Sequence, residues 1–193
     1  EHPEIFTSRT GELKTDYQTA NQIIERMTND PVFFHYMAGE KQVIKTGTLF
    51  GCEWKIKMDS YFPGSCIVDL KVMRSLERIM GISFVEYWKY DMQLAVYSEI
   101  EGTGLETYIA VATKQTPADI EVIHVPKWRR QECLKQVEAN LPRILAVKRG
   151  EVEPERCGVC PYCRATKRLE KPIDFELVGF STKEIKAMKG EFA

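Results

Sequence analysis

The sequence predicts an α/β fold in which helices flank one mixed sheet. The spacing of apolar residues changes along the 193-residue chain from a helical period to alternation and back. Segments of the two kinds follow one another in the order α, α, β, β, β, α, β, β, α. A chain of this length suits one domain, so we expect a single domain over residues 1–193 with a cysteine-rich extension from about residue 151.

Four segments carry the helical period. The first begins near Asp16, a candidate N-cap, and the second has Pro31 in its first turn and Gly39 at its end. The third is amphipathic, and the fourth is long and should bend near Pro142 before it ends at Gly150. We expect these helices over residues 16–28, 30–39, 84–100 and 127–150.

Five short segments have the composition or the alternation of strands. In residues 53–59, Trp54, Ile56 and Met58 point to one side, because successive side chains of a strand alternate. The turn over residues 60–65 contains proline and glycine, so a hairpin between its two flanking strands is the economical pairing. The expected strands cover residues 42–50, 53–59, 66–72, 107–113 and 120–125.

Composition and charge exclude several classes of protein. The chain is 44% hydrophobic and 28% charged, with a net charge of −1 and a pI near 6.4. This charge excludes a uniformly basic nucleic-acid coat, but it does not exclude a local basic groove. No apolar run approaches the roughly 20 residues of a membrane span, and we expect no membrane partner. Six unevenly spaced cysteines do not resemble a secreted disulfide framework. We therefore expect a reducing, cytoplasmic setting.

The strand CIVDLKV, residues 66–72, contains an acid and a base where an apolar core is expected. Asp69 and Lys71 share one face of this strand, and Asp59 ends the neighbouring strand of the hairpin. Two converging carboxylates make a hard-oxygen site that suits Mg²⁺ or Mn²⁺, and the Leu70 carbonyl could add a ligand. Lys71 would then stand beside the ion, as metal-assisted phosphodiester hydrolysis requires. The alternative is an Asp–Lys ion pair on an exposed strand.

The third helix has a polar and aromatic face. Tyr90, Gln93 and Tyr97 are spaced i, i+3 and i+7, so they lie on one side of the helix. Their hydroxyl and amide groups could bind a substrate phosphate or hold the lysine. The alternative is a half-buried stripe that packs on the sheet.

Taken together, these motifs resemble a known nuclease family. Asp59, the stretch IVDLK at 67–71 and the stretch YDMQLAVY at 90–97 resemble the PD-(D/E)XK nuclease superfamily, and most closely its RecB/RecE-like branch of phage and prophage exonucleases. The stretches LFGCEWKIKMDSY, YIAVATK and CGVCPYC resemble the same branch, so the resemblance runs from about residue 5 to about residue 170.

The resemblance implies a restriction-endonuclease-like core of the order αβββαβ. It assigns Asp59 and Asp69 as metal ligands, Lys71 as the catalytic lysine, and Gln93 and Tyr97 as members of a glutamine motif. The superfamily also has an acidic residue or a histidine upstream of these positions. Glu40 is the first candidate for that position and His35 the second, while a solvated glutamate is the alternative for Glu40.

The implied activity is that of a Mg²⁺-dependent deoxyribonuclease. By resemblance, it is an exonuclease that hydrolyses duplex DNA ends during phage-type recombination in the cytosol of a bacterial host. The implied partners are DNA, a single-strand annealing protein and further copies of the chain. A structure- or site-specific endonuclease on the same fold and a catalytically inert nucleic-acid-binding module are the alternatives. The sequence has no recognisable base-reading element, which favours sequence-independent processing.

The tail contains a cysteine motif. Cys157, Cys160 and Cys163 form C-x2-C-x2-C, a spacing typical of zinc or iron–sulfur sites. Some nucleases of the RecB/RecE-like branch hold a [4Fe–4S] cluster with one cysteine before the core and three after it. Here no cysteine precedes Cys52, so Cys133 is the candidate for a fourth ligand within the chain. The alternative is three reduced thiols in a tight turn.

Basic residues flank these features. They could follow a DNA backbone and make its binding depend on salt, or they could form solvated faces. One group opens the long helix and the other follows the cysteines: Lys127, Arg129, Arg130, Arg164, Lys167, Arg168 and Lys171.

Overall fold

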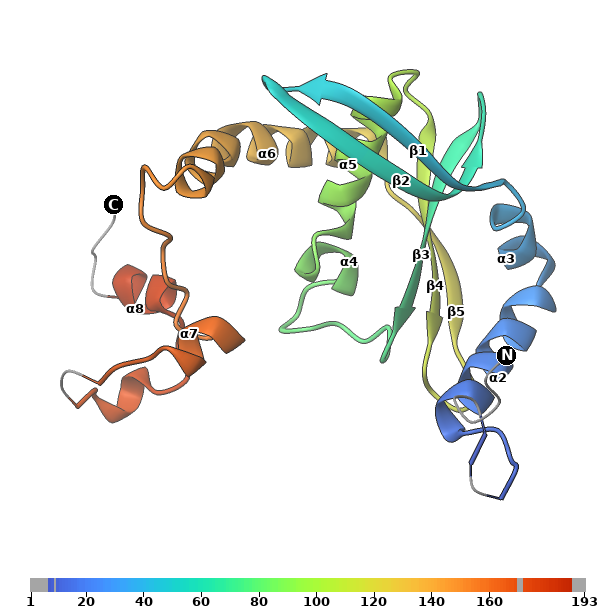
Figure 1. The fold of residues 1–193 in the computed structure, drawn as a ribbon, viewed down its shortest axis with the longest axis horizontal. Helices are drawn as coiled ribbons and strands as arrows, with labels where there is room; N and C mark the ends of the chain where they lie inside the picture. Colours follow the sequence, from blue (N-terminus) through green and yellow to red (C-terminus); the bar gives the residue numbers. More distant parts are fainter. Residues whose placement is uncertain (1–6, 9, 170–171, 189–193) are drawn as a thin grey trace. The chain divides into compact units, whose positions relative to one another are not determined.

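The computed structural model describes residues 7, 8, 10–169 and 172–188 (Figure 1). The chain forms two compact units, with the boundary between Leu141 and Pro142. The first unit contains the sheet, and the second contains the cysteine motif.

The first unit is built on a five-stranded mixed sheet of order β1-β2-β3-β4-β5. Neighbouring strands are antiparallel except β3 and β4, which are parallel. The predicted α/β class with a mixed sheet is therefore confirmed, and so is the hairpin of β2 with β3. The strands are β1 (Glu40–Leu49), β2 (Cys52–Phe62), β3 (Cys66–Met73), β4 (Glu106–Thr113) and β5 (Ile120–His124).

Helices lie on both faces of this sheet in Figure 1. In the first unit these are α2 (Thr15–Thr28), α3 (Pro31–Tyr36), α4 (Phe84–Tyr87), α5 (Tyr90–Glu101) and most of α6 (Lys127–Lys148). The second unit holds the last turns of α6, α7 (Pro161–Ala165), the 3₁₀ helix η1 (Phe175–Leu177) and α8 (Thr182–Met188).

Several expected boundaries were wrong. The helix expected over residues 84–100 is interrupted, because Lys89 takes a left-handed conformation with φ 60° between α4 and α5. The helix α2 begins at Thr15 with Lys14 as its N-cap, so Asp16 lies inside the first turn, where a carboxylate favours the helix dipole. The strand β2 continues to Phe62, which leaves a turn of only three residues, 63–65.

The central strand β3 is buried on both faces. Ile67 packs with Ile109 and Val111 of β4 in the core that includes Leu94 of α5. The next residue, Val68, packs on the opposite side in the core that includes Phe33 of α3 and Ala110. Because side chains alternate along a strand, Asp69 and Lys71 continue the row of Ile67 towards α5.

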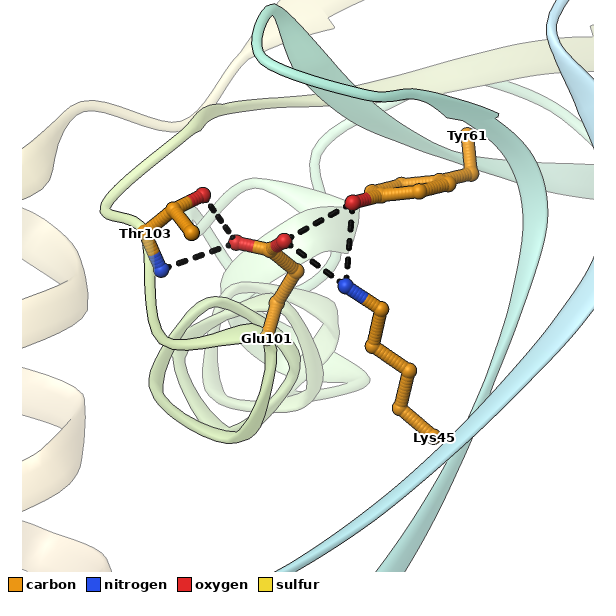
Figure 2. A network of polar contacts seen from close by, with 4 residues as sticks. All are labelled: Lys45, Tyr61, Glu101 and Thr103. Carbon is orange, nitrogen blue, oxygen red and sulfur yellow. Dashed lines mark hydrogen bonds and ion pairs between the residues drawn. The ribbon is translucent and has the colours of Figure 1, made fainter.

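A buried ionic network ties the β1–β2 hairpin to the end of α5 (Figure 2). The Glu101 carboxylate, 8% exposed, accepts hydrogen bonds from Lys45 Nζ and Tyr61 Oη, both at 2.8 Å. Its other oxygen accepts from the Thr103 amide at 3.0 Å and from the Thr103 hydroxyl at 2.6 Å. Burial alone would raise the pKa of Glu101, but the bonds from Lys45 and Thr103 outweigh it and lower the pKa to about 2.

We expect Glu101→Gln to destabilise the protein by about 2–3 kcal/mol at pH 7, because it removes a carboxylate with several donors, one of them charged. Urea unfolding measures this difference, with Glu99→Gln on the exposed side of α5 as the control of near-zero effect. Because its pKa is lowered, the Glu101 carboxyl stabilises the folded protein fully at pH values above 4.5, the ordinary pKa of this group. That contribution is lost as the pH falls through about 2. The gap between the wild type and Glu101→Gln should therefore narrow between these two pH values, and a gap that is constant with pH would contradict the assignment.

Candidate active site

Asp69, Lys71 and Gln93 contact one another between β3 and α5. Lys71 Nζ lies 2.5 Å from Asp69 Oδ2 and donates a hydrogen bond to Gln93 Oε1 at 3.0 Å. The Gln93 amide nitrogen in turn donates to Asp69 Oδ1 at 2.7 Å. One helix residue thus fixes both the acid and the base of the strand, as the glutamine motif of the sequence predicts.

Asp59 lies beside Asp69, across the β2–β3 hairpin. The last paired residues of the hairpin are Ser60 and Val68, so the next position in this register brings Asp59 opposite Asp69. At that point the ladder ends, and Asp59 Oδ2 accepts a hydrogen bond from the Leu70 amide at 2.9 Å instead. The side chain of Asp59 therefore substitutes for the lost backbone pairing and holds a second carboxylate at the site.

The environment of Asp69 is unfavourable for an isolated charge. The residue is only 3% exposed, and this burial, with the nearby charge of Asp59, raises the pKa of the Asp69 carboxyl, while Lys71 and Gln93 act in the opposite direction. Asp69 Oδ2 is buried, and among the described residues its partner is the Lys71 ammonium, at 2.5 Å. A buried carboxylate oxygen in this state, with a second carboxylate beside it, fits the donor set of a hard divalent cation.

Lys71 has one further contact, with the ring of Tyr90. Its ammonium lies 4.6 Å from the centroid of the Tyr90 ring, an arrangement in which the ring face attracts the cation. The Tyr90 hydroxyl is anchored on Met73 Sδ at 3.5 Å. The lysine side chain keeps 18% of its surface exposed, so it is positioned and still accessible.

Among the described residues, no hydrogen bond or ion pair joins the side chains of the other predicted site residues to this group. Tyr97 follows Gln93 by one turn of α5 and packs against the apolar core, and among the described residues no hydrogen bond joins it to the group. Glu40 begins β1 opposite Tyr61 and is exposed. His35 stacks on Phe62 at 6.0 Å, on the α3 side of the sheet. Leu70 supplies its backbone amide to Asp59, and a ligand role for its carbonyl oxygen stays a prediction.

One contact of the site was not foreseen from the sequence. Gln42 Nε2 donates to Asp59 Oδ1 at 2.7 Å, so both oxygens of this carboxylate are engaged. Gln42 has a φ of 56°, a left-handed conformation that glutamine seldom adopts inside a strand. Alternation of apolar and polar residues carries no signal of such a local reversal, which explains why the residue was missed.

The cysteine motif of the second unit is compact. The Sγ atoms of Cys157, Cys160 and Cys163 all lie within 4.8 Å of one another, and those of Cys157 and Cys163 are 3.9 Å apart. Backbone hydrogen bonds from Val159 and Cys160 lower the pKa of the Cys157 thiol to about 7. A thiol with a lowered pKa is closer to the thiolate form that binds metals.

Cys133 differs from these three residues. It is buried in the first unit, where burial and the charge of Asp91 raise the pKa of its thiol to about 11. The three cysteines of the motif belong to the second unit, so a role of Cys133 as the fourth ligand stays a prediction.

The predicted basic residues have different surroundings. Arg129 is neutralised by Asp91, at 2.7 Å, and by Glu86. In the second unit, a pocket of about 710 Å³ is lined by four cations and by apolar side chains; the cations are Arg156, Arg164, Lys167 and Arg168. Lys171 lies outside the described residues. None of the described helices is both long enough and apolar enough to cross a bilayer.

Comparisons with known proteins agree with this geometry. A crystal structure of a protein from Eubacterium rectale, described as a "Putative exonuclease", is 52% identical to this chain, with a TM-score of 0.78 over 92% of this chain and 71% of the other. A structure of the protein SSO0001 is 16% identical over 77% of this chain and 68% of the other, with a TM-score of 0.36, too low to support an argument. No curated protein matches the chain. Residues 1–166 match the family described as a PDDEXK-like domain of unknown function (DUF3799), and the chain therefore belongs to this family of PDDEXK-like domains.

Proposed function

We propose that this chain is a metal-dependent deoxyribonuclease that acts as an exonuclease on the ends of duplex DNA. The observation that carries the proposal is the buried Asp69 carboxylate, which lies beside Asp59 and is contacted by a lysine held in place. Membership of a PDDEXK-like family and the 52% identity to a protein described as an exonuclease support a phosphodiester hydrolase.

Oxygen atoms of the chain would hold the cation. Asp59 and Asp69 are the first candidates, and the Leu70 carbonyl is a third. Glu40 and His35 are weaker candidates, because no contact with the pair is found for them among the described residues. Carboxylate and carbonyl oxygens suit Mg²⁺ or Mn²⁺. When bound, such an ion polarises a phosphoryl oxygen and lowers the pKa of a coordinated water.

Lys71 is the residue that we assign to the chemical step. Its ammonium can orient the attacking water or stabilise negative charge on the phosphate as the transition state forms. Gln93 holds Lys71 and Asp69 at a fixed separation, and Tyr90 limits the rotation of the lysine side chain. Tyr97 supports this face of α5 through the core, so we assign it a positioning role.

The alternatives are less well supported. An endonuclease that reads a site requires an element that contacts base edges, and the sequence has no recognisable one. An inert binding module has no need for an acid, a base and a glutamine that contact one another. Phage-type recombination in a bacterial cytosol, an annealing-protein partner and a homo-oligomer complete the proposal, on the resemblance alone.

We also propose that the cysteines of the second unit bind one zinc ion. Around tetrahedral zinc, with Zn–S bonds of about 2.3 Å, the sulfur atoms lie about 3.8 Å apart. The 3.9 Å between Cys157 and Cys163 matches this value. In a four-iron cluster each cysteine binds a different iron, so its sulfurs lie further apart; an iron–sulfur cluster is therefore the second choice.

In the direct test, wild-type protein with Mg²⁺ should degrade linear duplex DNA and spare covalently closed circles. Lys71→Ala should reduce the single-turnover rate on the order of a hundredfold or more, the scale of losing one acid–base or charge-stabilising group. Affinity for DNA ends, measured in Ca²⁺, should change only about severalfold, because phosphate contacts are spread over many residues.

Lys57→Ala, an exposed lysine on the neighbouring strand, is the matched control and should keep the wild-type rate. A Lys71→Ala enzyme that cleaves at nearly the wild-type rate would refute the assigned site. Rapid cleavage of covalently closed circles would refute the proposed exonuclease activity, because such circles have no ends.

The zinc proposal is tested by elemental analysis of freshly purified protein. The wild type should carry about one zinc per chain, because three thiolates and one further ligand complete a tetrahedral site. Cys160→Ser should lose most of it, while Cys52→Ser, outside the group, should retain it. Equal zinc in Cys160→Ser and the wild type, or iron with visible absorption in the wild type, would contradict the proposal.

A further inference from the structure

A second polar pocket lies between the end of α5 and the beginning of α6, and it shares no residue with the Asp69 site. Its volume is about 220 Å³. This is smaller than the roughly 300–1,000 Å³ of sites for drug-sized ligands. The residues of its lining that matter here are Ser98, Glu99, Gly102, Lys127, Arg130 and Gln131.

Arg130 is a buried cation whose hydrogen-bonding capacity is only partly used. It is 3% exposed, and its Nη1 donates to Thr107 Oγ1 at 2.8 Å and to the Val125 carbonyl at 3.3 Å. Its Nε is buried without an acceptor. A buried polar N–H without a partner is costly, and more so on a charged group.

Among the described residues, none forms an ion pair with this guanidinium, because no carboxylate of theirs lies within ion-pair distance of Arg130. The charge of Glu106 acts on it from a distance, but Glu106 is engaged by His124 at 2.7 Å. Glu99, which also lines the pocket, is exposed to solvent.

The beginning of α6 adds further positive charge. Three of the first four residues of this 22-residue helix are cations, and no acidic residue lies in the first turn. This arrangement opposes the helix dipole, which favours anions at the N-terminus. Asp91 neutralises Arg129, whereas no ion pair to Lys127 is found among the described residues. Lys127 and Arg130 thus leave an excess positive charge at the pocket.

We propose that this pocket binds a phosphate group of the nucleic-acid substrate, away from the Asp59 and Asp69 carboxylates. The inference rests on the proposed function for the source of the phosphate, because a nuclease binds a chain of them. A guanidinium and an ammonium together form a recurrent phosphate-binding arrangement. The pocket volume of about 220 Å³ has room for a phosphate group. The pocket would then hold the DNA at a fixed distance from the scissile bond.

The first experiment uses inorganic phosphate without metal or DNA, so that its result does not depend on cleavage. Phosphate should raise the melting temperature of the wild type at constant ionic strength, and calorimetric titration should give a dissociation constant. Lys127→Gln should weaken phosphate binding about tenfold, as expected for one lost charged contact. Lys135→Gln, an exposed lysine two turns further along α6, should bind as the wild type does.

Arg130→Gln should abolish phosphate binding. If that variant does not fold, Ser98→Asp replaces it, because the new carboxylate would occupy the pocket as an internal counter-ion; it should fold and be insensitive to phosphate. The catalytic variant Lys71→Ala should bind phosphate normally.

The second experiment compares duplexes with 5′-phosphate and 5′-hydroxyl ends in Ca²⁺. Lys127→Gln should weaken DNA binding and lower the salt slope by about 1, as for one lost phosphate contact. If the variant weakens binding only to 5′-phosphorylated ends, the pocket binds the terminal phosphate. If it weakens binding to both kinds of end, the pocket binds an internal phosphodiester. The proposal is overturned if phosphate does not bind, if Lys127→Gln equals Lys135→Gln, or if polyglutamate but not DNA displaces phosphate.

Discussion

The structure depends on one arrangement: a carboxylate, Asp69, in a strand that is buried on both faces. Burial penalises the charge, and the chain offsets it with Lys71 from the same strand and Gln93 from α5. These contacts require α5 to pack on the sheet in one fixed position. The apolar cluster that contains Ile67, Ile109 and Leu94 holds the helix there. The offset is incomplete, because burial still raises the pKa of the Asp69 carboxyl. In our proposal, a divalent cation held by Asp69 and Asp59 supplies the remaining compensation.

Much of the fold and of the candidate site could be predicted from the sequence, because local strand and helix geometry determines which side chains share a face. Alternation placed Asp69 and Lys71 on one face, and the helical period brought Gln93 to the side that meets them. The short turn with Pro63 and Gly64 fixed the hairpin, and its register brings Asp59 opposite Asp69. The fold class followed from the same periods. These predictions hold because strand and helix geometry leave few choices once the apolar face must be buried.

What could not be predicted depends on backbone reversals and on distant partners. Lys89 and Gln42 both take left-handed conformations, and neither residue type signals this. The left-handed conformation of Lys89 interrupts a helix that the sequence predicts as continuous. The left-handed conformation of Gln42 accompanies the hydrogen bond from its side chain to Asp59. Glu101 reads as a solvated residue at a helix end, yet it is buried by Lys45 and Tyr61 from strands some 40 or more positions away in sequence. Cys133 is buried in the first unit, and its role as a fourth ligand of the cysteine motif stays a prediction.

The central claim is that the two carboxylates bind a divalent cation, and Mn²⁺ bound in a crystal of the wild-type protein tests it most directly. The anomalous signal of manganese identifies the ion without assumptions about the chemistry. We expect one strong peak in contact with an oxygen of Asp59 and with Oδ2 of Asp69, with Gln93 still bound to Asp69 Oδ1. An ion held elsewhere in the first unit, or a fully loaded crystal in which both carboxylates stay more than one water molecule away from any ion, would contradict the account.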